Sequence, residues 1–179
     1  MAAPPGLRIV LLGAMGTGKS TVGRALAQRL DVPFVDNDET LQALNGRSAG
    51  DILRADGVAA LRTAEATTAL HLLSLPPPVV VALAAGAIED GDIRKSLRRV
   101  DTVVFLSAAV QTLAERVRRD EEHGKGRPWV GTDPAAALRR LSQGREPLYA
   151  EVADVVVDVD QVSPALAVTQ VLATIGWPP

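Results

Sequence analysis

The chain has 179 residues, of which 47% are hydrophobic and 22% are charged, the balance of one globular domain rather than of a disordered or fibrous chain. Its formal net charge of −2 excludes a general affinity for nucleic acid or acidic membranes, because both require a cationic surface. The absence of cysteine excludes disulfides and thiolate metal sites, and with no signal peptide and no apolar run of about 20 residues we expect a cytoplasmic protein.

Five short apolar runs, rich in valine, isoleucine and leucine, predict strands that are buried on both faces of a parallel sheet. They lie at residues 8–12, 32–36, 79–83, 102–106 and 154–159. Segments with helical spacing lie at residues 19–30, in pieces over about 38–74, after residue 106, at about 134–144 and from Ser163-Pro164 onward. Within the second of these segments, breaks are expected near Gly46 and Gly57. This alternation, without repeats or a linker, predicts a single α/β domain over residues 1–179.

The turn between the first strand and the first helix matches the phosphate-binding pattern G-x-x-x-x-G-K-[ST] at every position. Glycines allow the backbone to direct successive N–H groups into one concavity, where they bind phosphate oxygens together with the positive end of the following helix. The Lys19 ammonium group neutralises the β- and γ-phosphates, and the Ser20 hydroxyl group is a ligand for Mg²⁺. The expected ATP site consists of Gly13, Met15, Gly16, Thr17, Gly18, Lys19, Ser20 and Thr21.

Two acidic residues, Asp36 and Asp38, follow the second predicted strand. The carboxyl ends of the strands of an open α/β sheet face the ligand crevice, so both side chains are expected near the phosphates. A carboxylate there holds Mg²⁺ or accepts the proton of an attacking hydroxyl group. The alternative for Asp38 is that it only caps the next helix.

Basic residues occur in two places that suit phosphate chemistry. Residues 120–133 are polar and glycine-rich, which is typical of a mobile loop. Arg127 in this loop is a candidate to close over the γ-phosphate, and the alternative is a solvated basic loop without such a role. Arg116, Arg118 and Arg119 form a charge run on the preceding helix, which by itself is typical of a solvent-facing surface.

Taken in order, these features resemble shikimate kinase, a relative of the nucleoside monophosphate kinases, over nearly the whole chain. Beyond the phosphate-binding turn, the matching strings are Phe34-Val-Asp36-Asn-Asp38, Asn45-Gly-Arg-Ser-Ala-Gly-Asp-Ile-Leu53, Leu61-Arg62 with Glu65, Gly126-Arg127-Pro128 and Arg145-Glu-Pro-Leu-Tyr149. The resemblance implies a P-loop NTPase three-layer sandwich, with a five-stranded parallel sheet of order 2-3-1-4-5 and helices on both faces. It also implies a substrate-binding region at about 38–74, a mobile lid at about 120–133, and a monomer.

The resemblance further implies transfer of the γ-phosphoryl group of ATP to the 3-hydroxyl group of shikimate, with Mg²⁺. By this resemblance, Lys19 and Arg127 would stabilise the transferred phosphoryl group. Ser20 and Asp36 would organise Mg²⁺. Asp38 would contact the ring hydroxyl groups and orient or deprotonate the nucleophile.

The same resemblance assigns four further residues to the ligands. Arg62 and Arg145 would bind the carboxylate of the substrate, a task that suits two planar guanidinium groups. Arg119 and Pro164 would flank the adenine. The implied partner is therefore a small carboxylated molecule, not a nucleic acid or a membrane.

One segment departs from the family, whose third strand typically ends in three glycines beside the substrate. Here the matching positions are Ala84, Ala85 and Gly86, and an alanine in a left-handed conformation would cost about 1–2 kcal/mol. Either both alanines have ordinary β geometry and only narrow the pocket, or the acceptor is a related cyclitol, aminoshikimate or sugar acid. A third hypothesis is a nucleotide-binding regulatory module that has lost catalysis.

Overall fold

Residues 3–122, 133–160 and 162–177 are described by the computed structural model of the chain. Arg127 and most of the expected lid at about 120–133 lie outside these residues. In the described part of the chain, no helix combines the length and the apolar character that crossing a membrane requires.

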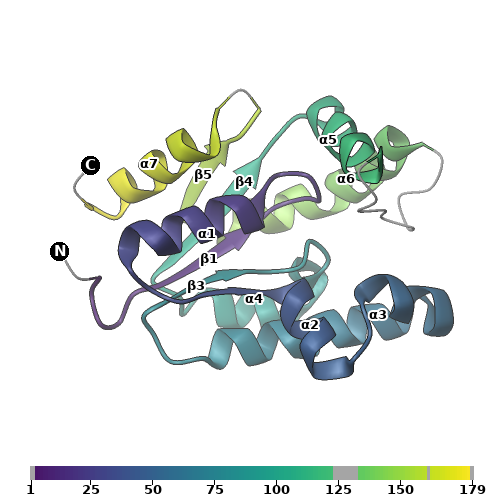
Figure 1. Cartoon of the computed structure of the whole chain (residues 1–179), viewed down its shortest axis with the longest axis horizontal. Helices are drawn as coiled ribbons and strands as arrows, with labels where there is room; N and C mark the ends of the chain where they lie inside the picture. Colours follow the sequence, from purple (N-terminus) through teal and green to yellow (C-terminus); the bar gives the residue numbers. More distant parts are fainter. Residues whose placement is uncertain (1–2, 123–132, 161, 178–179) are drawn as a thin grey trace.

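A five-stranded parallel sheet forms the centre of the molecule (Figure 1). Its strands are β1 (Arg8–Leu12), β2 (Phe34–Asp36), β3 (Val79–Ala82), β4 (Thr102–Ser107) and β5 (Val155–Asp158). They are hydrogen-bonded in the order β2-β3-β1-β4-β5, and every neighbouring pair is parallel. The expected fold class and strand order are therefore confirmed.

Seven α-helices and one short 3₁₀ helix surround the sheet in the described residues. They are α1 (Lys19–Leu30), α2 (Asn37–Asn45), α3 (Ala49–Ser74), the 3₁₀ helix η1 (Ala87–Glu89), α4 (Gly91–Leu97), α5 (Val110–Glu122), α6 (Pro134–Val152) and α7 (Pro164–Thr174). The two predicted breaks are confirmed, because α2 ends against Gly46 with φ 67° and α3 is kinked at Gly57 with φ 85°.

The alternation of side chains along the central strands explains the three layers. In β3, Val80 faces the core cluster that includes buried residues of α1 and α7, whereas Val79 and Val81 face the cluster that includes α3 and α4. Successive side chains of a strand point to opposite faces of the sheet, so a strand covered on both faces is apolar at every position. All four residues of β3 are buried for this reason.

Helix α6 is longer than the sequence predicts, because it continues past Gly144 to Val152 and contains Pro147. A proline inside a helix removes one hydrogen bond and is unfavourable by about 3 kcal/mol. Burial offsets this penalty: Tyr149 is 1% exposed and stacks on Phe105 of β4, with ring centroids 4.9 Å apart. The continuation brings Arg145 to the carboxyl edge of the sheet, where the strands end.

Candidate active site

The nucleotide loop, Gly13–Ser20, connects β1 to α1 at the carboxyl edge of the sheet. Gly13, Gly16 and Gly18 have φ angles of 147°, 85° and 85°, in the region that favours glycine. A Cβ atom on Gly13 would also lie 2.6 Å from the carbonyl oxygen of Leu106. The loop therefore needs glycine at these positions, and α1 begins directly behind it with its free N–H groups.

Two side chains of the nucleotide loop stabilise it by hydrogen bonds to the loop's own carbonyl groups. The buried Thr17 donates from Oγ1 to the carbonyl oxygen of Ala14 at 2.8 Å. Lys19 donates from Nζ to the carbonyl oxygens of Gly13 and Ala14, at 2.9 and 3.1 Å. The ammonium group thus lies over the loop, within reach of a phosphate group that the loop would hold.

Ser20 and Asp36 form a hydroxyl–carboxylate pair between α1 and the end of β2. Ser20 donates from Oγ to Oδ2 of Asp36 at 2.6 Å, and Asp36 is 8% exposed. This pair fits Mg²⁺, which is commonly held by one or two protein oxygens together with phosphates and waters. The described residues contain no group of three or more acidic, histidine or cysteine side chains placed to hold a metal ion.

Asp36 also caps α2, because its Oδ1 atom accepts from the backbone N–H of Asp38 at 2.9 Å. The alternative interpretation, in which Asp38 caps this helix, is therefore wrong: the capping residue is two positions earlier. Asp38 lies in the first turn of α2. Its side chain lines the pocket described next.

A pocket of about 360 Å³ lies at the carboxyl edge of the sheet. Most of the residues predicted from the sequence line it together: Met15, Gly16, Gly18, Lys19, Ser20, Thr21, Asp36, Asp38, Ala84, Ala85 and Arg119. Four lining residues were not proposed as site residues from the sequence: Glu65, Leu83, Arg116 and Asp120. Six predicted residues lie outside the lining: Gly13, Thr17, Arg62, Gly86, Arg145 and Pro164.

Ala84 and Ala85 pass along this pocket without backbone strain. Among the described residues, Asp31 is the only non-glycine residue with a positive φ. The penalty for a left-handed alanine therefore does not arise. The β geometry that the first interpretation expects is not seen at Ala85, which lies in a turn closed by the hydrogen bond from the N–H of Ala87 to the carbonyl oxygen of Ala84. The methyl groups remain, so the pocket is narrower here than it would be with glycine.

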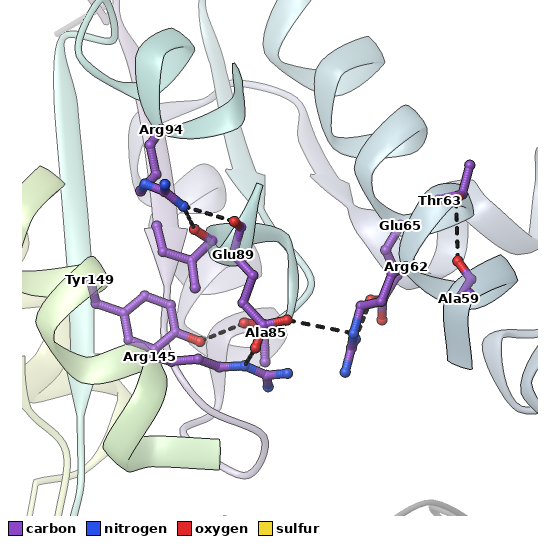
Figure 2. A network of polar contacts seen from close by, with 10 residues as sticks. Ala59, Arg62, Thr63, Glu65, Ala85, Glu89, Arg94, Arg145 and Tyr149 are labelled. Carbon is purple, nitrogen blue, oxygen red and sulfur yellow. Dashed lines mark hydrogen bonds and ion pairs between the residues drawn. The ribbon is translucent and has the colours of Figure 1, made fainter. Parts of the chain in front are cut away.

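Arg62 and Arg145 both contact Glu89, and with Glu65, the partner of Arg62, they form the arginine cluster (Figure 2). Arg62 in α3 pairs through Nη1 with the buried Glu65, which lines the pocket. Arg145 in α6 is 4% exposed and donates from Nε to Oε1 of Glu89 at 2.9 Å. The second oxygen of Glu89, Oε2, lies 3.7 Å from Nε of Arg62.

Gly86 provides the space for the Arg62 guanidinium group. Its φ of −81° is open to any residue, so backbone conformation does not require glycine there. A Cβ atom at this position would instead overlap the guanidinium group of Arg62, at 2.7 Å from Cζ. The glycine of the Ala84-Ala85-Gly86 segment is thus needed for a side-chain contact.

Burial changes the titration of two groups at this end of the site. It raises the pKa of Glu65, against the charge and hydrogen bond of Arg62, which lower it. It also raises the pKa of Tyr149, whose hydroxyl group donates to the carbonyl oxygen of Ala85 at 2.7 Å. Tyr149 therefore stays neutral, and its hydrogen bond connects α6 to Ala85 on the floor of the pocket, which Ala84 and Ala85 form.

Arg116 connects the nucleotide loop to the end of β5. It donates from Nη1 to the carbonyl oxygen of Gly16 at 3.2 Å and from Nη2 to that of Val159 at 2.6 Å. The interpretation of this charge run as a solvent-facing surface is therefore wrong for Arg116. The sequence around Arg116 does not indicate these contacts, because the partners are backbone carbonyl groups that are distant in sequence.

Pro164 lies at the first position of α7, after the capping Ser163, whose Oγ accepts from the N–H of Leu166 at 3.2 Å. The predicted start of this helix is confirmed. Pro164 itself is exposed and outside the pocket lining.

Comparisons with known proteins agree with one another. The family model described as shikimate kinase matches residues 15–176. A shikimate kinase of Pseudomonas savastanoi is 36% identical over 169 residues, covering 94% of this chain and 95% of the relative, and one of Bordetella pertussis is 39% identical over 170 residues, covering 94% and 78%. The solved structure of shikimate kinase from Acinetobacter baumannii in complex with shikimate has a TM-score of 0.86 and 32% identity, covering 95% of this chain and 93% of that one.

Proposed function

The chain belongs to the shikimate kinase family, and from this premise we propose that it transfers the γ-phosphoryl group of ATP to the 3-hydroxyl group of shikimate. One observation carries the proposal: Lys19, the Ser20–Asp36 pair and Asp38 line the same pocket as the floor residues Ala84 and Ala85. Donor-binding and acceptor-binding groups are thus adjacent, as direct phosphoryl transfer requires. The shikimate bound to the relative from Acinetobacter baumannii supports the choice of acceptor.

On the donor side, the N–H groups of the nucleotide loop and the first turn of α1 bind the phosphates. Lys19 exchanges its hydrogen bonds to Gly13 and Ala14 for phosphate oxygens and stabilises charge on the transferred group. Ser20 and Asp36 hold Mg²⁺, which when bound neutralises charge on the β- and γ-phosphates.

Three further residues complete the proposed donor site. Arg119, which lines the pocket, would flank the adenine together with Pro164. Arg127, which lies outside the described residues, would stabilise the transferred phosphoryl group.

On the acceptor side, Asp38 orients the attacking hydroxyl group and accepts its proton. Arg62 and Arg145 bind the carboxylate group at the far end of the acceptor, since both guanidinium groups are held on the same carboxylate, that of Glu89. The methyl groups of Ala84 and Ala85 border the ring and limit its size.

The state of the protein in the cell belongs to the same proposal. The family resemblance supports a monomer. The absence of cysteine fits a reducing cytoplasm, and the net charge of −2 supports a partner other than nucleic acid.

The test is a coupled assay with ATP, Mg²⁺ and a panel of acceptors: shikimate, aminoshikimate, a cyclitol and a sugar acid. We expect the highest kcat/KM with shikimate. Absence of turnover at millimolar shikimate, while ATP still binds, would contradict the proposal. The wild type could instead turn over another acceptor faster than shikimate, while Ala84→Gly/Ala85→Gly prefers shikimate. This result would show that the two methyl groups set a different specificity.

A further inference from the structure

Glu89 stands between the two arginines of the arginine cluster and contacts both (Figure 2). It is the last residue of η1, the 3₁₀ helix that follows the pocket floor. One carboxylate oxygen accepts from Nε of Arg145 at 2.9 Å, and the other lies 3.7 Å from Nε of Arg62. Glu89 belongs neither to the segments that carry the family resemblance nor to the residues that line the pocket.

The contacts of Glu89 use one nitrogen of each guanidinium group and leave others available. Both contacts are made through Nε, and Glu65 takes Nη1 of Arg62. Within the described residues, Arg145 makes no hydrogen bond through Nη1 or Nη2. In Figure 2 the Nη ends of both side chains point to the same side of the Glu89 carboxylate.

Electrostatics explains why a carboxylate is needed here. Two guanidinium groups that converge repel each other, and Arg145 is 4% exposed, so its charge is poorly solvated. A buried charge without a partner is strongly unfavourable. The carboxylate of Glu89, which is 47% exposed, supplies the counter-charge and a bridge between the two groups.

The backbone of Glu89 is itself fixed to the fold. Arg94 of α4 donates from Nη1 to the carbonyl oxygens of Ile88 and Glu89, at 2.7 and 2.9 Å. Tyr149 holds the carbonyl oxygen of Ala85, four residues earlier. The bridging carboxylate therefore starts from a backbone segment held at both ends, as positioning of a binding group requires.

We propose that Glu89 is a positioning residue that determines acceptor specificity: it holds Arg62 and Arg145 as a pair whose Nη groups receive the carboxylate of the acceptor. The inference rests on the proposed function, since it deepens the account of the same acceptor site. It assigns Glu89 no contact with the reacting atoms. Its effect is on binding of carboxylated acceptors, and neither ATP binding nor the transfer step depends on it.

The first part of the test is kinetic and compares Glu89→Ala and Glu89→Gln with the wild type. Glu89→Ala is expected to raise the KM for shikimate about tenfold with kcat within about twofold and the KM for ATP unchanged, the signature of lost binding that is uniform along the reaction. Glu89→Gln retains one acceptor oxygen, so its KM is expected to rise about threefold. With shikimate methyl ester, which lacks the charge, the variants and the wild type should have the same KM.

Glu151→Gln is the matched control, because Glu151 pairs with Arg98 at 2.5 Å and is 45% exposed, away from the pocket. It should leave every constant unchanged. An unchanged KM for shikimate in a folded Glu89→Ala protein would overturn the proposal. A fall in this KM would also overturn it, since Glu89 would then compete with the acceptor carboxylate.

The second part needs no substrate. In ¹⁵N NMR spectra of the ligand-free protein, the Nε–H signals of Arg62 and Arg145 should exchange slowly with water in the wild type and rapidly in Glu89→Ala. If the wild type does not phosphorylate shikimate, the proposed function fails by itself. The exchange rates then still decide whether Glu89 holds the arginine pair.

Discussion

The nucleotide loop and the arginine cluster lie at the same edge of the sheet and are built in different ways. The nucleotide loop is eight consecutive residues, and its shape is set by glycine backbone angles and hydrogen bonds within the loop. The arginine cluster takes Arg62 and Glu65 from α3, Glu89 from η1 and Arg145 from α6. Under the proposed function, phosphate would be bound by local backbone structure, whereas the acceptor would depend on side chains that only the complete fold brings together.

The largest expected effect is on the nucleotide loop. Lys19→Met removes the ammonium group that lies over the loop, and we expect kcat to fall about 10³-fold because charge on the transferred group loses its stabilisation. Steady-state kinetics with ATP and shikimate measure this. Lys95→Met, which removes an exposed lysine paired with Asp92, is the control. Undiminished turnover in Lys19→Met would contradict the proposed donor site, and an unchanged biological activity would favour the regulatory-module hypothesis.

A smaller effect is expected where the arginine cluster needs space. Gly86→Ala places a methyl group against the guanidinium group of Arg62, so Arg62 must move and the KM for shikimate should rise about tenfold while the KM for ATP stays the same. The matched control is Gly91→Ala, whose added Cβ atom would be 3.7 Å from its nearest neighbour, Nη2 of Arg94. If Gly86→Ala and Gly91→Ala have the same KM for shikimate, Arg62 does not contribute to binding of the acceptor.

Tyr149→Phe tests how α6 supports the pocket floor. The phenylalanine keeps the stacking on Phe105 but leaves the carbonyl oxygen of Ala85 without its donor. We expect the free energy of unfolding to fall by about 1–2 kcal/mol in urea denaturation. The control is Ser74→Ala, which loses a hydrogen bond of the same 2.7 Å length at an exposed position. This substitution should change the free energy of unfolding by less than about 0.5 kcal/mol. A similar loss in both variants would argue against a special role of the Tyr149 hydroxyl group.

The smallest expected effect is the pH dependence that Glu65 gives to stability. Burial raises the pKa of Glu65 in the folded state above its ordinary value of 4.5, so the folded protein binds more protons than the unfolded chain between the two pKa values. The free energy of unfolding should therefore fall as pH rises through this interval. Glu65→Gln removes this contribution, so the stability of the wild type relative to Glu65→Gln should decrease with pH. An increase would mean that the ion pair with Arg62 outweighs burial.

The features predicted from the sequence are those that depend on neighbouring residues. The nucleotide loop and the breaks at Gly46 and Gly57 follow from local patterns, whereas the strand order was implied by the family resemblance. The end of α6 was predicted wrongly, since Gly144 and Pro147 disfavour a helix locally while the burial of Tyr149 stabilises it from a distance.

Glu89 and Arg116 were missed for the same reason. An exposed glutamate directly after an apolar pair has no distinctive spacing, and its partners come from α3 and α6. Arg116 binds carbonyl groups of Gly16 and Val159, which no side-chain pattern can reveal. Long-range contacts of single side chains are the part of this site that a sequence does not display.

The carboxylate of Asp36 connects the nucleotide loop to the first turn of α2. Its Oδ2 atom accepts from Ser20 of the nucleotide loop, and its Oδ1 atom accepts from the backbone of Asp38. Under the proposed function, this one side chain therefore links the serine expected to bind Mg²⁺ to the helix turn of Asp38, the proposed proton acceptor.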